Sequence, residues 1–128
     1  MTHEMQMVLI LLTLLQVKHL FADYFLQTPR MLSDRARYAH LGRVQHAGVH
    51  AGLSLVALLL VGVGPLFALV ICLVEGVAHF HIDWIKGRHA ESSGKGPDQA
   101  GYWHAFGVDQ LMHQLTYVAM LWAVVACG

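Results

Sequence analysis

Four long apolar stretches, separated by short polar segments, dominate the sequence and limit the folds open to it. They cover residues 5–27, 43–63, 65–86 and 103–127. A helix needs about 20 mostly apolar residues to cross the hydrocarbon core of a bilayer. With 56% hydrophobic and 12% charged residues, the chain is too apolar for an ordinary soluble domain of its size. We therefore predict an all-α membrane protein, a single membrane domain over residues 1–128 built as a bundle of four transmembrane helices.

The polar segments contain turn and loop residues and most of the basic side chains. Pro29 opens the first loop, a Gly-Val-Gly-Pro turn fills 62–65, and 86–102 is expected to be a flexible loop. The basic residues of the two longer loops are Arg30, Arg35, Arg37, Arg43, Lys86, Arg88 and Lys95. Because positive charge favours the cytoplasmic side, we expect both loops there. Both termini should then lie on the periplasmic or exterior side of a bacterial inner membrane.

Several functional classes find no support in the sequence. Eight basic residues balance eight acidic residues without a basic tail, so we expect no nucleic-acid partner. Cys72 and Cys127 lie in apolar runs and are expected to pack as small hydrophobic residues. The chain has no phosphate-binding glycine loop and no nucleophile motif of an acyl-enzyme. The first stretch lacks a cleavage site and is expected to be a retained helix.

Histidine is the unusual component, with ten copies, because a histidine inside a membrane needs a polar partner. Each apolar stretch carries two polar residues four positions apart, which places both on one face of a helix. The pairs are His19 and Asp23, His46 and His50, His79 and Asp83, and Asp109 and His113. Helices one and three should carry their pairs near their C-terminal ends, and helices two and four near their N-terminal ends. In an up-down bundle, all four pairs then meet in one layer in the cytoplasmic half of the bilayer.

The two halves of the chain also resemble each other. The sequence HLFADY at 19–24 is similar to HFHIDW at 79–84, and the pair at 46 and 50 corresponds to the pair at 109 and 113. The repeat predicts two similar helical hairpins related by an axis along the membrane normal. The polar site would then have approximate two-fold symmetry.

Imidazole and carboxylate groups together are typical ligands of transition metals. We predict one or two divalent ions, with zinc favoured over manganese or iron. The candidate metal ligands are His19, Asp23, His46, His50, His79, Asp83, Asp109 and His113. The candidate catalytic groups are Asp23, Asp83 and Asp109. Residues that would orient or support the site are Gln27, Glu75, Gln110 and Lys86.

Other interpretations of these polar residues stay open. A single histidine or aspartate in a transmembrane helix often only makes a hydrogen bond to another helix. The whole set could therefore form a metal-free polar network or a proton relay, and haem ligation is a weaker alternative because carboxylates crowd the site. Glu75 is expected to be either protonated or within reach of the site. Lys86 is expected either to extend to the membrane surface or to meet an anionic group.

The motifs that contain the pairs resemble those of a family of small bacterial and phage membrane proteins, the domain of unknown function DUF3307. They are KHLFADYFLQ at 18–27, HAGVH at 46–50, HFHIDWIK at 79–86 and DQLMH at 109–113. The resemblance extends over nearly the whole chain and departs mainly in the first loop, where arginines stand in place of lysines. It implies a histidine-rich four-helix membrane protein and brings no established reaction. A more distant similarity of pattern links the chain to membrane-embedded metal-dependent hydrolases.

Three hypotheses of function follow from the sequence. The first is a metal-dependent hydrolase acting on a lipid or amphiphile from the cytoplasmic leaflet, in which Asp83→Asn abolishes turnover while the protein still inserts. The second is a metal-binding or metal-transporting protein, which could work as a homo-oligomer. Transport requires polar residues through the whole membrane, and the halves of the helices away from the pairs offer almost none. The third is an accessory subunit of a larger membrane complex.

Overall fold

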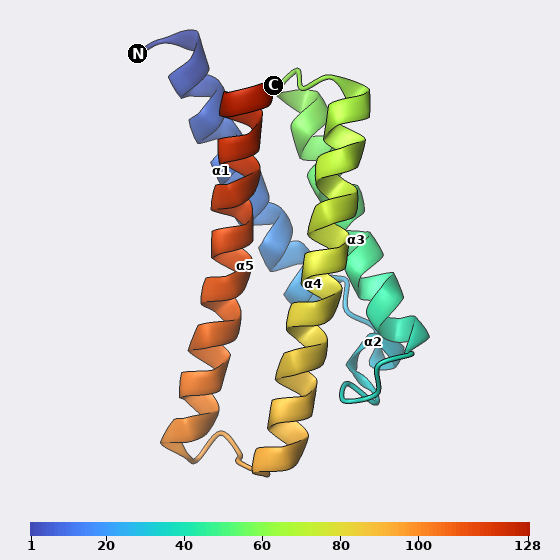
Figure 1. Ribbon diagram of the computed structural model, residues 1–128. Coiled ribbons are helices and arrows are strands. Elements are labelled where there is room, and N and C mark those ends of the chain that lie inside the picture. Colours follow the sequence, from blue (N-terminus) through green and yellow to red (C-terminus); the bar gives the residue numbers. More distant parts are fainter.

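The computed structural model describes residues 1–128 and is entirely helical (Figure 1). The helices are α1 (His3–Leu20), the π-helical turn η1 (Phe21–Phe25), the short α2 (Pro29–Leu32), α3 (Leu41–Leu60), α4 (Pro65–Ser93) and α5 (Ala100–Cys127). The predicted all-α class is confirmed, with five α-helices of which four are long.

The four long helices form a bundle in which the backbone of each helix packs beside two others. Helix α1 packs beside α3 and α5, and α4 also packs beside α3 and α5, so α1 and α4 lie diagonally opposite. Both termini and the turn between α3 and α4 lie at one end of the bundle (Figure 1). Helix α2 and the link between α4 and α5 lie toward the other end. This is an up-down arrangement that brings the two predicted polar loops to the same side.

Three helical segments are long and apolar enough to cross a membrane: His3–Phe25, Pro65–Ser93 and Ala100–Cys127. These segments mark a multi-pass membrane protein. Helix α3 is not among them because Arg43, His46 and His50 make its first half polar, so a fourth crossing stays a prediction. Large apolar side chains cover the outside of the bundle, with Leu66 77% and Trp122 76% exposed. Lipid is the solvent that such a surface requires.

The apolar core fills the end of the bundle that carries the termini. It includes Leu11 and Leu15 from α1, Leu58 from α3, Ile71 from α4 and Leu121 from α5. Lys18, Ser54 and Glu75 are buried just on the terminal side of the histidines and aspartates, and beyond them the buried side chains are apolar. This apolar core, called the apolar floor below, closes the polar layer on the side of the termini.

The expected flexible loop at 86–102 is wrong, because only residues 94–99 lie outside α4 and α5. Helix α4 ends where Gly94 takes a left-handed conformation (φ 62°) and donates its N–H to the carbonyl of Ala90, a turn that glycine adopts without strain. At 29 residues, α4 is about 43 Å long and exceeds the roughly 30 Å hydrocarbon core. The polar pairs of α4 and α5 consequently lie in the middle of these helices, and the α4–α5 hairpin projects beyond the end of α1 (Figure 1).

Candidate metal centre

Histidine and aspartate side chains from all four long helices meet in one layer of the bundle. The structure brings together the whole predicted ligand set: His19, Asp23, His46, His50, His79, Asp83, Asp109 and His113. None of these side chains is more than 22% exposed. Four separate helices thus contribute to a single buried polar site.

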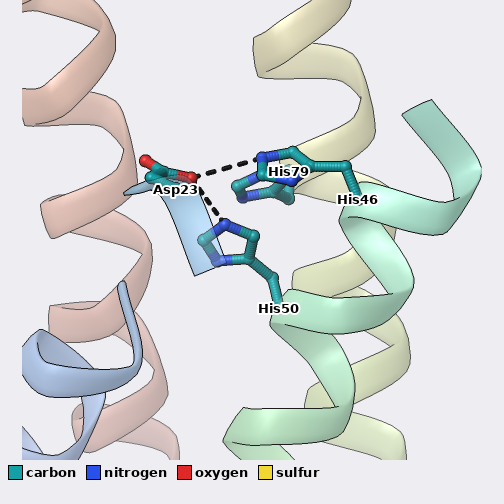
Figure 2. Close-up of side chains that lie close together, drawn as sticks. All are labelled: Asp23, His46, His50 and His79. Carbon is teal, nitrogen blue, oxygen red and sulfur yellow. Dashed lines mark hydrogen bonds and ion pairs between the residues drawn. The ribbon is translucent and has the colours of Figure 1, made fainter. Parts of the chain in front are cut away.

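Asp23 is placed by the π-helical turn that follows α1. The first helix was expected to continue to position 27, but the backbone changes to π-helix after Leu20, and the N–H of Leu26 bonds the carbonyl of Phe21 at 2.8 Å. Such wide turns are frequent at functional sites. The turn directs one carboxylate oxygen of Asp23 toward His50 Nε2 at 2.8 Å and His46 Nε2 at 3.2 Å (Figure 2).

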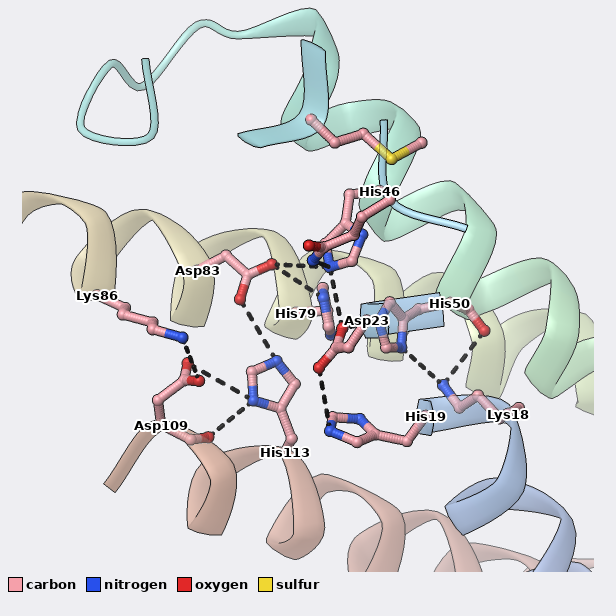
Figure 3. Close-up of polar contacts among 12 residues, drawn as sticks. Lys18, His19, Asp23, His46, His50, His79, Asp83, Lys86, Asp109 and His113 are labelled. Carbon is pink, nitrogen blue, oxygen red and sulfur yellow. Dashed lines mark hydrogen bonds and ion pairs between the residues drawn. The ribbon is translucent and has the colours of Figure 1, made fainter. Parts of the chain in front are cut away.

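Asp83 is the corresponding carboxylate on α4. Its Oδ2 lies 2.9 Å from His79 Nε2 and 3.6 Å from His46 Nε2, and its Oδ1 lies 3.5 Å from His113 Nε2 (Figure 3). The imidazole of His79 stacks on that of His50, with 3.9 Å between ring centroids. The centroid of the His79 ring also lies 4.4 Å from that of the His113 ring. His79 therefore lies between His50, which contacts Asp23, and His113, which contacts Asp83.

The ligand atoms form two overlapping groups that could each hold a metal ion. In each group the atoms lie within 4.8 Å of one another. The first group is Asp23, His46, His50 and His79, and the second is His79, Asp83 and His113. His79 Nε2 and His113 Nε2 lie near the Asp83 carboxylate, but neither buried nitrogen makes a hydrogen bond of good geometry. A buried polar atom without a partner is unfavourable, and a transition metal would satisfy these nitrogens.

His19 and Asp109 lie at the edge of the cluster and belong to neither group. The ring of His19 bonds the Tyr117 hydroxyl at 2.8 Å and the Gln110 side-chain oxygen at 3.0 Å. Asp109 Oδ2 accepts hydrogen bonds from Lys86 Nζ at 2.8 Å and Gln110 Nε2 at 3.1 Å, while its buried Oδ1 has no partner. Their proposed role as metal ligands stays a prediction.

A buried lysine that the sequence analysis did not consider supports the cluster from the apolar side. Lys18 is only 5% exposed, and its Nζ lies 2.5 Å from Glu75 Oε1 and 3.2 Å from His50 Nδ1. Glu75 therefore reaches the site through Lys18. The signal in the sequence was a lysine in the middle of an apolar helix, where an unpaired charge would be costly.

The ion pair between Lys18 and Glu75 leads to a prediction about stability. Lys18→Met should lower the free energy of unfolding by about 3–5 kcal/mol, because it leaves a buried carboxylate without its partner. Adding Glu75→Gln should restore most of that loss, since the double variant buries no uncompensated charge. Equilibrium unfolding in mixed micelles would measure both variants, with Lys95→Met as an exposed control. A double variant as unstable as Lys18→Met would contradict the proposed pairing.

The loop before α3 covers the polar layer and is fixed by a second buried cation. Arg43 is 4% exposed, and its guanidinium donates to the backbone carbonyls of Arg35, Arg37 and Tyr38. Trp84 Nε1 adds a bond of 3.1 Å to the carbonyl of Ala36. These contacts hold the loop against α3 and α4.

A small, almost wholly polar pocket of about 50 Å³ lies between this loop and the cluster. Its walls include Asp23, His46 and Asp83 on the cluster side and Arg35 and Gln27 on the loop side. Gln27 Nε2 is 3.4 Å from His46 Nε2. The volume suffices for one or two water molecules, so the cluster has a polar approach from the side of the loops.

Comparison with known proteins gives a single result. A family model described as "Protein of unknown function (DUF3307)" matches residues 10–127. No curated protein and no solved structure matches the chain. The match agrees with the resemblance of the four polar motifs, and it attaches no reaction to them.

Proposed function

The chain belongs to the DUF3307 family of proteins of unknown function, and we propose that it is a membrane-embedded, metal-dependent hydrolase that cleaves a lipid or other amphiphile from the cytoplasmic leaflet. The observation that carries the proposal is the pair of overlapping histidine and aspartate groups that share His79 beneath a small polar pocket. The donor set suits zinc, with manganese or iron as alternatives.

A transition metal bound in these groups would activate a water molecule and polarise the oxygen of a scissile bond. His46, His50, His79 and His113 would hold the ions, together with Asp23 and Asp83. Asp109 would accept the proton that the attacking water loses and return it to the leaving alcohol, because its Oδ1 is buried and free of hydrogen bonds. The hydroxyl of the water goes to the acyl or phosphoryl group, so one water is consumed per bond broken.

The arrangement of the helices supports a site with two ions. The His-x-x-x-Asp pairs stand on the diagonal helices α1 and α4, and the pairs ending in histidine stand on the other diagonal, α3 and α5. Asp23 faces His50 as Asp83 faces His113. This correspondence is what an approximate two-fold axis along the bundle would produce, although His79 belongs to both ligand groups and its counterpart His19 to neither.

The apolar floor favours a one-sided reaction centre over metal transport. Leu11, Leu15 and Leu58 are completely buried on the terminal side of the cluster, and a conduit would need polar groups along its full depth. Access from one side is what an enzyme needs to receive an amphiphile and release its products.

Turnover of defined lipids tests the proposed function. Detergent-purified protein loaded with zinc, manganese or iron would be incubated with lipids that contain a carboxylic ester, a phosphomonoester or a phosphodiester. We expect mass spectrometry to detect cleavage of one class, and we expect a chelator to stop it and added metal to restore it. A variant with His46, His50 and His113 changed to alanine is the control. A protein that holds metal and cleaves none of the classes would refute the proposal.

A further inference from the structure

A groove of about 560 Å³ runs between α4 and α5, in the part of the hairpin that begins beside the cluster. The α4 side presents Ile82 and Ile85, three residues apart, and the α5 side presents Ala105, Val108 and Met112. These spacings place each set on one face of its helix. Ile85 is 61% and Val108 60% exposed, so the two faces offer open apolar surface to a ligand.

One unpaired lysine, Lys95, borders this apolar surface. The ionisable groups that line the groove are Lys86, His89, Lys95, His104 and Asp109. Asp109 is the one carboxylate among them, and it is paired with Lys86 at 2.8 Å. Lys95 and the two histidines have no acidic partner among the lining residues. The groove therefore combines apolar helix faces with the amines of Lys95 and Lys86, which complements an acyl chain joined to an anionic group.

The groove and the polar pocket above the metal centre share a wall. Lys86 and Asp109 line both spaces. On the inner side of this wall, Asp109 Oδ1 lies 3.7 Å from His113 Nδ1 (Figure 3). A group that meets Lys86 from the groove thus lies beside Asp109, which is close to His113 of the cluster.

We propose that the groove between α4 and α5 binds a phosphate-bearing lipid, with an acyl chain along the two apolar faces and the phosphate at Lys86 and Lys95. The inference rests on the proposed hydrolase for the fate of this lipid, while binding itself does not require the reaction. The volume lies in the range of small-ligand sites. Lysines close to a membrane surface attract anionic headgroups. Burial of an acyl chain against the apolar helix faces is also favourable.

Lipid binding to purified protein that has been incubated with zinc tests the groove directly. Native mass spectrometry would compare dioleoyl phosphatidic acid with dioleoylglycerol, which has the same chains without phosphate, and with inorganic phosphate. We expect phosphatidic acid to bind roughly tenfold or more tightly than dioleoylglycerol, and Lys95→Gln to reduce this preference about fivefold. Ala105→Trp, which fills the groove, should weaken both lipids at least about tenfold. Val74→Trp, on the exposed lipid-facing side of α4, should leave binding unchanged.

Each other result has a defined meaning. If Ala105→Trp binds lipid as well as the parent does, the groove is not the binding site. If the two lipids bind equally, the lysines do not recognise the phosphate. Inorganic phosphate that competes as well as the whole lipid would show a free-anion site instead. Metal content, measured on the same samples, separates this inference from the proposed function. Phosphatidic acid bound in the groove of a protein that takes up no metal would refute the hydrolase and leave the lipid site standing.

Discussion

Changing His46, His50 and His113 together to alanine should leave the purified protein without bound metal, while the parent holds one or two ions per chain. Each candidate group needs at least three ligands to hold an ion firmly. After the change, the first group retains only Asp23 and His79, and the second retains only His79 and Asp83. Elemental analysis by mass spectrometry of detergent-purified protein would measure the loss.

The control for this experiment is a variant with His3 and His81 changed to alanine, because neither histidine belongs to a candidate group. It should keep the full metal content. Circular dichroism and a monodisperse chromatographic profile would show that the triple variant still folds, as we expect when buried polar residues in a membrane bundle are replaced by alanine. A parent that takes up no transition metal under any loading condition would instead indicate a metal-free polar network.

The convergence of the polar residues could be predicted because it depends on helical geometry alone. Residues four apart share one face of a helix, and the alternation of the helices brings His19 of the first and His113 of the last into the same layer. Neither step requires knowledge of how side chains pack. The apolar floor followed from the same reasoning, since the other half of each helix contains almost no polar residues.

The parts that the sequence could not predict depend on contacts between distant segments. In the part of α4 past position 86, Gly87 lacks a side chain, which allows the backbone of Arg35 in the distant first loop to approach closely. Lys18 is acceptable in the membrane only because Glu75 meets it from another helix. The π-helical turn that orients Asp23 leaves no mark in residue spacing, because His19 and Asp23 are four apart in either type of helix.

These contacts also explain how a small bundle can keep a polar site rigid. Lys18 and Glu75 fix the site from the apolar side, and Arg43 ties the covering loop to α3 from the opposite side. A site held from both sides would keep its ligands in place before an ion binds, which would reduce the cost of ordering them. Rigid support of this kind is what a catalytic constellation requires.

Asp83→Asn should reduce turnover at least about a hundredfold while the protein still inserts and folds. Asparagine keeps the size of the side chain and removes the charge that faces His46, His79 and His113, and loss of a carboxylate at a metal site is typically severe. Because Asp83 belongs only to the second group, a two-ion site should lose one ion and keep the other. Elemental analysis and the lipid-cleavage assay would be run on the same preparation.

The metal content and the turnover of Asp83→Asn, measured together, separate the roles of the two candidate ligand groups. Asp34→Asn is the matched control, since Asp34 lies in the loop with a positive φ of 43° that asparagine also tolerates. It should retain both ions and full turnover. If Asp83→Asn loses an ion and all activity, the second group contributes an ion that the reaction needs. If it keeps full turnover, Asp83 has no part in the chemistry, and the reaction must then depend on the group around Asp23 alone.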